Sequence, residues 1–532
     1  MISNIKKQSF YFIYILLLGL VYFTYVFYVG FSPGDDTFHI NFVKENPTII
    51  DNVIENFKIS PARIISGIMI GIVHPLLTDN YILFNLISLS LWIGTALILK
   101  NTFKILINKK FSELFFLIFS FPYLCFSIFY GNLLWATYIL FIFFWSISFF
   151  FQIKYLEYNS KIYSFFYYLF LVISIFTFEL IIPLLVINIL LPIYYKKKIF
   201  HKIKNFLIVL LFSLIFLFYK IFLIPNITNI PIYGVSNLSL ISILQGIYFF
   251  YAVTIENIIL LIQSIKFSTN FISLIIFFLL FLLFNNFKLE KIINKNFLLL
   301  IFILSLLSNT IIFFISGYPA VTYGHYSKML VPAFFSLTFI ISYLISNFNI
   351  NKWFLIGFLF LVINSTYSQI NNYAKATKIK NDLLENLSDE VLKNNFNRND
   401  IVLVNSPLFV QQNFNNEEIV FTTWDLKYAI LNRTQKNLNF WLISDRMINY
   451  LSYYPVANFM NSEYLKNESN KNIKVFYYQY KSNLKNFEIL QTKEEVLKKI
   501  NYLKNNPINI DKFIFREKIR LKLKNMIFDL LY

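Results

Sequence analysis

Two adjacent carboxylates, Asp35 and Asp36, follow the first long apolar run of the chain. They lie in the stretch SPGDDTFH, residues 32–39, in which proline and glycine favour a turn at the membrane surface. Neighbouring carboxylates repel each other, so one of them more readily accepts a proton and can act as a general base. The alternative is that the two acidic groups only cap a helix that begins at Thr37. The pair is the first candidate for a reactive centre.

Arg63 and Glu179 are two further charged residues beside apolar sequence. Arg63 precedes the glycine-containing run Ile64–Leu77, which is too short to cross a bilayer and is expected to lie in its interface. The planar guanidinium suits a phosphate group, although a simple interfacial anchor would occupy the same position. Glu179 lies deep in apolar sequence, where a carboxylate is costly and indicates function, unless it only bonds to backbone at a helix break.

A third polar group occupies the stretch GYPAVTYGHYSK, residues 317–328. His325 and Lys328 could complement a phosphate, and the rings of Tyr323 and Tyr326 could stack on the faces of sugars. Tyrosines are equally common in the interfacial belt of any membrane protein. The sequence contains no nucleotide-binding loop, dinucleotide fingerprint, zinc motif or serine hydrolase signature, so cytosolic nucleotide chemistry has no support.

The composition requires that most of the chain lie in lipid. Of its 532 residues, 57% are hydrophobic and only 14% are charged, well below the roughly 25% of a soluble domain. Apolar runs of about 16–24 residues fill the first two-thirds and match the roughly 20 residues that a membrane-crossing helix needs. Their continuity favours helices, because barrel strands would alternate lipid-facing and lumen-facing residues. We therefore expect an α-helical polytopic membrane protein with about eleven transmembrane helices.

The formal net charge of +19 would suit nucleic acid, but the lysines cluster in short loops between apolar runs, where they act as orientation signals. We expect the lipid bilayer as a partner and no nucleic acid. Lys6 and Lys7 place the N-terminus in the cytoplasm, so the first loop, residues 32–79, lies outside. The single Cys125 provides no disulfide framework and no thiolate metal site.

Three apolar stretches are expected to meet the membrane in other ways than as one straight span. Residues 162–195 are too long for one straight pass and have lysines at both ends, so they should form two helices that turn near residues 177–179. This turn places Glu179 near the outer face. Residues 111–151 are expected to form a hairpin of two spans that turns at Gly131. Residues 240–265 are interpreted as a re-entrant or interfacial segment, because a full crossing would put the following lysines outside.

The sequence divides into two predicted domains. Residues 1–368 form the transmembrane domain, and hydropathy falls from residue 369 to the last residue, 532. Helix-like sequence in this tail alternates with strand candidates at 401–404, 419–422 and 473–478, which predicts a small α/β domain outside the cytoplasm. The basic run at 512–524 is interpreted as a solvated helix face, with contact to anionic headgroups as the alternative.

The acidic pair after the first helix, the long first outer loop with an arginine, the many spans and the outer C-terminal domain together resemble GT-C membrane glycosyltransferases. The chain is most similar to O-antigen-modifying, serotype-converting glucosyltransferases and their uncharacterised relatives. The resemblance covers the architecture of nearly the whole chain. Its sequence-specific part rests on Gly34-Asp35-Asp36-Thr37-Phe38, Pro61-Ala62-Arg63 and Phe178-Glu179. It implies a protein of the bacterial cytoplasmic (inner) membrane that acts on the extracytoplasmic face, in the cell envelope.

The resemblance also implies a reaction. Enzymes of this class use polyprenyl-phosphate sugars as donors, with an outer-loop carboxylate near the acceptor hydroxyl and basic groups near the leaving phosphate. The acceptor here would be a cell-surface glycan or lipid. Carried over by position, Asp35 or Asp36 is the base, Glu179 is a secondary acidic group, and Arg63 or Lys328 is a phosphate partner.

The last outer loop departs from the pattern of the class. Relatives often have arginine there, whereas residues 323–328 of this chain read YGHYSK, which weakens the phosphate assignment in this loop. The sequence requires no cofactor. The two aspartates could bind a divalent metal ion, but no further ligand cluster is readable in the sequence, so metal dependence stays open.

Two alternative functions compete with the transferase. A transporter or flippase of lipid-linked glycans would carry acidic and basic groups along a path through the bilayer, and Lys220 and Glu256 are compatible with that interpretation. An O-antigen polymerase would be expected to have arginines in large outer loops, and arginine is scarce before the tail.

Overall fold

The structure is a computed structural model in which part of the chain is described. The described residues are 2–30, 43, 45–46, 48–59, 61, 63–77, 80–131, 135–224, 240–264, 271–284, 295–316, 322, 325–348, 350–393, 396, 401–405, 409–411, 416–418, 423–443, 475–481, 486–490, 495 and 498. Internal contacts group the chain into two compact units. Unit 1 comprises Met1–Val29 and Asn46–Asn371, and unit 2 comprises Gly30–Glu45 and Asn372–Tyr532.

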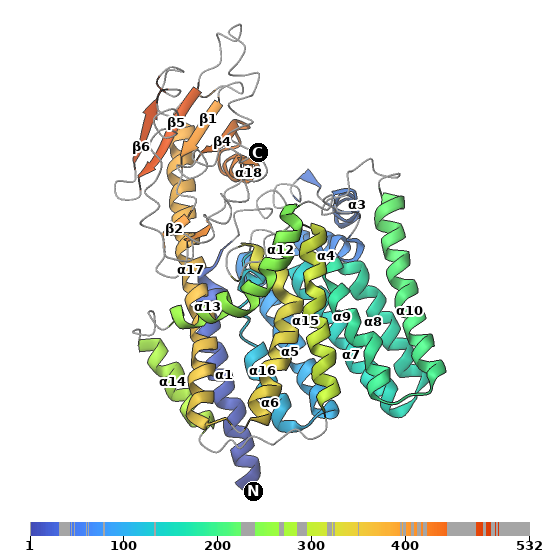
Figure 1. Ribbon diagram of the computed structural model, residues 1–532. Helices are drawn as coiled ribbons and strands as arrows, with labels where there is room; N and C mark the ends of the chain where they lie inside the picture. The colour runs from blue at the N-terminus through green and yellow to red at the C-terminus, as the bar shows by residue number, and fades with distance from the viewer. Residues whose placement is uncertain are drawn as a thin grey trace. The chain divides into compact units, whose positions relative to one another are not determined.

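Unit 1 is a bundle of helices (Figure 1). Its α-helices are α1 (Ile2–Tyr28), α3 (Ile49–Ile59), α4 (Ile64–Leu77), α5 (Tyr81–Leu106), α6 (Lys109–Phe119), α7 (Leu140–Tyr158), α8 (Lys161–Thr177), α9 (Ile182–Tyr194), α10 (Ile199–Phe218), α12 (Leu240–Tyr251), α13 (Asn257–Gln263), α14 (Phe271–Phe284), α15 (Asn296–Ser316), α16 (Val331–Asn347) and the first part of α17 (Lys352–Lys393). Short 3-10 helices are η1 (Phe126–Phe129), η3 (Glu179–Ile181) and η7 (His325–Leu330), and π-helical turns are η2 (Trp135–Ile139), η4 (Tyr219–Leu223) and η5 (Ala252–Glu256).

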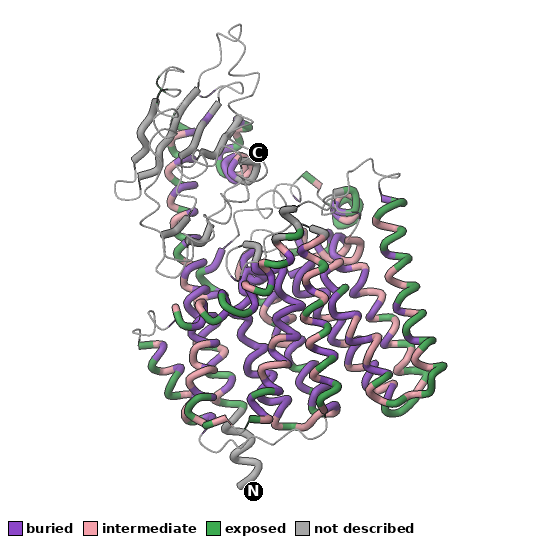
Figure 2. Tube along the Cα trace, in the orientation of Figure 1, coloured by how far each residue is buried: buried purple, intermediate pink, exposed green. Residues whose placement is uncertain are grey.

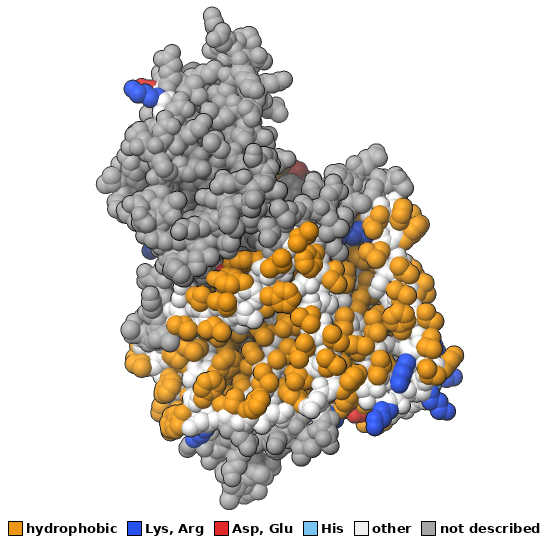
Figure 3. All heavy atoms as spheres, viewed as in Figure 1, with side chains coloured by type: hydrophobic (Ala, Val, Ile, Leu, Met, Phe, Trp, Pro, Cys, Tyr) orange, Lys and Arg blue, Asp and Glu red, His pale blue; other side chains and the backbone are white. Residues whose placement is uncertain are grey.

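The length and composition of these helices make the chain a multi-pass helical membrane protein. Within the described residues, eight helical segments are long and apolar enough to cross a bilayer, and four shorter helices are also apolar. Hydrophobic side chains cover the visible flank of the bundle, while Lys and Arg gather at its margins (Figure 3). The outermost helix, α10, shows exposed residues along most of its length, whereas buried residues fill the centre (Figure 2). This pattern is expected where lipid, and not water, surrounds the helices.

The prediction of a helical hairpin within residues 162–195 is confirmed. Helix α8 ends at Thr177, Phe178 is extended, and α9 follows the 3-10 turn η3. Pro183 lies in the first turn of α9, where its missing N–H costs nothing because the first helical N–H groups have no partner within the helix. The chain therefore reverses at Glu179, as the sequence indicated.

The prediction of two spans within residues 111–151 is wrong for the first of them. Helix α6 has only 11 residues and ends at Phe119, shortly before Pro122, which cannot continue a helix. At about 1.5 Å per residue it is roughly half as long as a bilayer core is thick. All of residues 120–131 are buried, including Gly131 with a positive φ of 146°.

Side chains from distant helices bind the irregular backbone that follows α6. Tyr22 of α1 donates to the Ser120 carbonyl at 2.6 Å, and Gln369 of α17 donates to the Tyr123 carbonyl at 2.6 Å. The indole of Trp92 in α5 donates to the Phe119 carbonyl at 3.1 Å. Non-helical backbone is tolerated at membrane depth only when protein satisfies its polar groups, and these bonds meet that condition.

Residues 240–263 form one continuous helical segment, α12–η5–α13, in which the described stretch Gln245–Gln263 is long and apolar enough to cross. In the view of Figure 1, α12 follows the direction of α15, whereas α13 turns across it. Gly246 of α12 lies against Phe314 of α15, where a Cβ atom would come within 2.4 Å of the ring. The re-entrant interpretation of this segment stays a prediction.

The last predicted span, ending at residue 368, continues without a break to Lys393. Helix α17 has 42 residues and contains no proline, and its single glycine, Gly357, lies near its start. The first helix-like sequence of the tail is thus the second half of the same helix. Nothing in the local sequence stops a helix at the point where hydropathy falls.

A buried polar network joins four helices of unit 1. The Asn188 amide accepts from the Trp145 indole at 2.8 Å and donates to Gln152 at 2.9 Å, while Asn205 donates to the Asn188 carbonyl at 2.9 Å. The Tyr167 hydroxyl donates to Asn205 at 3.1 Å. In lipid, helix association depends on such bonds and on close packing, so the network stabilises the α7–α10 group.

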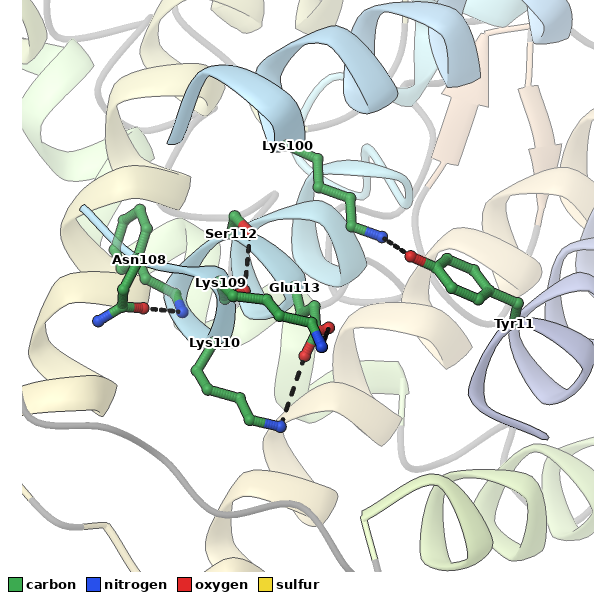
Figure 4. Close-up of polar contacts among 8 residues, drawn as sticks. Tyr11, Lys100, Asn108, Lys109, Lys110, Ser112 and Glu113 are labelled. Carbon is green, nitrogen blue, oxygen red and sulfur yellow. Dashed lines mark hydrogen bonds and ion pairs between the residues drawn. The ribbon is translucent and has the colours of Figure 1, made fainter. Parts of the chain in front are cut away.

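Two lysines that follow the turn between α5 and α6 form ion pairs with a glutamate of α6 (Figure 4). Lys109 and Lys110 form ion pairs with Glu113 at 3.8 and 3.7 Å. Asn108 caps α6 by accepting from the Phe111 N–H at 2.8 Å. The turn is fixed by its own polar residues.

Unit 2 contains strands as well as helices. The strands are β1 (Ile401–Asn405), β2 (Phe409–Gln411), β3 (Asn416–Glu418), β4 (Asn439–Ile443), β5 (Val475–Lys481) and β6 (Asn486–Leu490), and α18 covers Thr423–Thr434. Four strands form one sheet in the order β4-β1-β5-β6, with β1 parallel to both neighbours and β6 antiparallel to β5. Strands β1 and β5 overlap the stretches 401–404 and 473–478 that the sequence indicated.

Candidate functional site

A carboxylate forms ion pairs with two cations at one end of the bundle. Glu179 Oε1 accepts from Lys220 Nζ at 3.1 Å and lies 3.5 Å from Arg63 Nη2. The side chains of Arg63 and Glu179 are 35% and 25% exposed, so an incoming group can reach them, whereas Lys220 is 11% exposed. Arg63 immediately precedes α4, which lies with α3 at the end of the bundle opposite the N-terminus (Figure 1).

Local backbone breaks place the three charged groups. Glu179 begins η3, between α8 and α9, so its side chain leaves the chain where one helix has ended and the next has not begun. Lys220 lies in the π-helical turn η4 that continues α10, and such turns are frequent at functional sites. The neighbouring Tyr219 hydroxyl donates to the Pro61 carbonyl at 2.8 Å, which holds the segment before Arg63 against α10.

An aromatic pair connects this group to Lys328. The Arg63 guanidinium lies over the Phe178 ring at 4.3 Å, and Phe178 packs edge-on against Tyr138 with ring centroids 4.7 Å apart. Lys328 Nζ lies 5.2 Å from the centroid of the Tyr138 ring. Each cation is thus attracted by the electron-rich face of an aromatic ring. We refer to Arg63, Glu179, Lys220 and Lys328, with the rings of Phe178 and Tyr138, as the Glu179 cluster.

Three cations and one carboxylate lie together in the Glu179 cluster. Two cations within 3.5 Å favour the ionised form of Glu179. Its Oε2 atom is buried and has no hydrogen-bond partner among the residues that the structure describes. A guanidinium together with ammonium groups is a chemistry that suits a phosphate group.

The structure brings together three of the residues that the sequence singled out, namely Arg63, Glu179 and Lys328. Asp35, Asp36 and Tyr323 lie outside the described residues. His325 and Tyr326 belong to η7, and their side chains lie outside the described part of the chain. These five residues stay predictions.

Lys220 and Tyr138 were not among the site residues predicted from the sequence. Lys220 was compatible with a transport path, but its partner Glu179 is on another helix and could not be identified from spacing. The available signal was a lone lysine at the end of an otherwise apolar run, a position that is costly in lipid without a partner. Tyr138 gave no signal, because tyrosines are abundant throughout the chain.

The start of the loop that carries the aspartates is fixed by helix α5. Asn85 donates to the carbonyls of Tyr25, Val26 and Val29 at 3.0, 3.3 and 2.7 Å. The Tyr81 hydroxyl donates to the Phe27 carbonyl at 3.1 Å. The last carbonyls of a helix have no partner within it, so these bonds satisfy the C-terminal end of α1. The end of α1 is therefore held in place by α5.

The described residues contain no group of three or more His, Cys, Asp and Glu side chains that could hold a metal ion. The aspartate pair considered for a divalent metal is not among them. Comparisons with known proteins returned no relative: no family model, no curated protein and no solved structure matches the chain.

Proposed function

We propose that the chain is a GT-C type glycosyltransferase of the bacterial cytoplasmic membrane. It would transfer a sugar from a polyprenyl-phosphate donor to a cell-surface glycan or lipid on the extracytoplasmic face. The observation that carries this proposal is the grouping of Arg63, Lys220 and Lys328 around Glu179, Phe178 and Tyr138 at one end of an apolar helix bundle. A lipid-linked donor has its phosphate at the membrane interface and its polyprenyl chain among the lipids. A phosphate site at the end of the bundle can bind the phosphate while the polyprenyl chain stays in the bilayer.

The proposed reaction needs a base and a partner for the leaving group. The acceptor hydroxyl oxygen attacks the anomeric carbon, and the bond from that carbon to the phosphate oxygen breaks with its electron pair. The proton of the hydroxyl passes to Asp35 or Asp36, a step worth about 10²–10⁴-fold in rate. Arg63, Lys220 and Lys328 would stabilise the negative charge that grows on the departing phosphate.

Glu179 takes a positioning role in this scheme. Its ion pairs with Arg63 and Lys220 keep it charged and occupy the Oε1 atom, which makes it a poor proton acceptor. The same contacts hold two cations that would otherwise repel each other. Glu179 thus prepares the phosphate site and leaves proton transfer to the aspartates.

The membrane arrangement completes the proposal. About eleven helices would cross, with the N-terminus in the cytoplasm and a C-terminal α/β domain outside. Lys109 and Lys110 follow the turn between α5 and α6, and positive residues there support a cytoplasmic position for this turn. The mixed sheet β4-β1-β5-β6 supports a folded α/β domain in the tail.

The test measures transfer of radiolabelled sugar from polyprenyl-phosphate donors to acceptor in membranes that contain the purified full chain. Wild type is compared with Asp35→Asn, Asp36→Asn and the double variant. The matched control is Asp51→Asn, an exposed aspartate in the first turn of α3. We expect the double variant to lose at least 10²-fold in rate and the control to stay within twofold. Full transfer by the double variant would refute the base, and no transfer by wild type from any such donor would refute the enzyme.

The transporter alternative rests on Lys220 and Glu256. Lys220 is accounted for by its ion pair with Glu179, and Glu256 binds the backbone of Thr322 at 3.1 Å. Both residues therefore have partners within the protein, whereas a transport path needs polar groups through the thickness of the bilayer. Movement of a lipid-linked glycan across vesicles without any change in its covalent structure would favour the transporter or flippase. Extension of the glycan by whole repeat units would favour the polymerase.

A further inference from the structure

Glu256 is a fully buried carboxylate in the apolar segment α12–η5–α13. It is the last residue of the π-helical turn η5, which widens the helix at this point. A buried carboxylate in a membrane protein is costly unless it makes specific bonds, so its retention calls for a role. The scheme proposed above gives it none.

The carboxylate of Glu256 binds a segment that is 66 residues away in the sequence. Its Oε2 atom accepts from the backbone N–H of Thr322 at 3.1 Å. Its Oε1 atom accepts from the Tyr248 hydroxyl at 3.5 Å, which is long for a hydrogen bond. The bond to the backbone N–H holds Thr322, which lies three residues before the helical turn η7 starts at His325.

A second anchor lies just beyond Thr322. The Ser327 hydroxyl donates to the Ser127 hydroxyl at 2.8 Å, and the Tyr138 hydroxyl lies 3.7 Å from the Met329 sulfur. Lys328 stands between these two anchored residues, over the Tyr138 ring. Thr322 is thus bound by Glu256, and Ser327 and Met329, on either side of Lys328, contact residues of η1 and η2.

We infer that Glu256 is a positioning residue that holds the segment from Thr322 to Lys328, so that the ammonium group of Lys328 faces the phosphate of a lipid-linked sugar. The ligand in this inference rests on the proposed function, whereas the anchoring of the segment does not. Loss of the carboxylate would free the backbone at Thr322 and let the turn η7 move away from Tyr138. Affinity for the donor would then fall more than the rate of the chemical step.

The test measures the labelling rate of a reporter cysteine and, in variants without that cysteine, the kinetics of sugar transfer. Ser327→Cys provides a thiol reporter, because Ser327 is fully buried and the single native cysteine, Cys125, is buried as well. We expect Glu256→Ala to raise the maleimide labelling rate of this reporter at least tenfold. Glu256→Gln should stay within threefold of wild type, because its amide oxygen can still accept from the Thr322 N–H. Without the reporter, Glu256→Ala should raise the donor KM about tenfold and change kcat less than threefold.

Thr322→Pro removes the same bond from the other side, because proline has no backbone N–H. Combined with Glu256→Ala, it should add little to the labelling rate, as expected of two changes that break one interaction. If Glu256→Ala does not fold, Thr322→Pro alone tests whether the bond between Glu256 and Thr322 holds the segment.

An unchanged labelling rate of the reporter cysteine in Glu256→Ala would overturn the inference. If Glu256→Ala does not fold, an unchanged rate in Thr322→Pro would overturn it. Raised labelling with an unchanged donor KM would overturn it too, because the segment would then not serve the donor. Raised labelling in a protein whose wild type transfers no sugar would leave the anchoring intact and refute the proposed function.

Discussion

Replacing Lys220 by methionine removes one cation of the Glu179 cluster and keeps the length and apolar stem of the side chain. The ammonium lies 3.1 Å from Glu179 Oε1 and is only 11% exposed, so water screens the contact weakly. A hydrogen bond between charged groups contributes about 1.5–3 kcal/mol. If the same ammonium binds the phosphate of the donor in the transition state, its loss lowers kcat/KM by about tenfold to 150-fold.

The assay is the transfer of labelled sugar from a polyprenyl-phosphate donor, with kcat/KM measured over a range of donor concentrations in detergent or nanodiscs. The matched control is Lys204→Met, an exposed lysine near the other end of the same helix α10, for which we expect a change of less than twofold. Lys220→Arg should recover part of the activity because it restores the charge. Both Lys220 variants are first checked for a single monodisperse species.

Two results would refute the reasoning. If Lys220→Met folds and keeps kcat/KM within twofold of wild type, Lys220 does not bind the donor. If Lys204→Met loses as much activity as Lys220→Met, the loss reflects the net charge of α10 and not the contact with Glu179.

Three further predictions concern residues with defined contacts. Glu179→Gln should lower kcat/KM less than tenfold if the carboxylate only holds cations, and a fall above 10²-fold would make it the base instead. Asn188→Leu leaves the Trp145 indole without its acceptor and should destabilise the bundle by about 1–3 kcal/mol in detergent unfolding, so an unchanged midpoint would contradict the network. Gly71→Ala places a Cβ atom 2.6 Å from the α3 backbone and should lower the free energy of unfolding by about 1–3 kcal/mol. The control Gly19→Ala has open space around it and should raise the free energy of unfolding by about 0.5–1 kcal/mol. Equal effects of the two substitutions would contradict the close packing of Gly71 on α3.

The reversal of the chain at Glu179 and the short helix after Arg63 were predictable from the sequence. The reversal at Glu179 followed from a stretch too long for one pass and from lysines at both of its ends. Helix α4 covers Ile64–Leu77, the run that the sequence marked as too short to span. These features depend on length, charge and proline, all of which are local properties of the chain.

Contacts between helices were much less predictable. In a run where nearly every residue is apolar, no periodicity shows which face meets another helix. The ion pair of Lys220 with Glu179 and the packing of Tyr138 on Phe178 depend on helix rotation and crossing angle. The early end of α6 was missed because residues 120–131 are as apolar as a span, although they do not form one.

The buried stretch after α6 also constrains how the protein can be made. The Tyr123 carbonyl is satisfied by Gln369, which lies 246 residues later in the chain. At a synthesis rate of about 5–20 residues per second, Gln369 follows Tyr123 out of the ribosome by about 12–50 seconds. For that time the irregular backbone of residues 120–131 lacks one of its native partners, although α1 and α5 already flank it. This stretch therefore completes its native bonding only when nearly all of the membrane domain has been made, and a chain truncated before α17 would leave it unfinished.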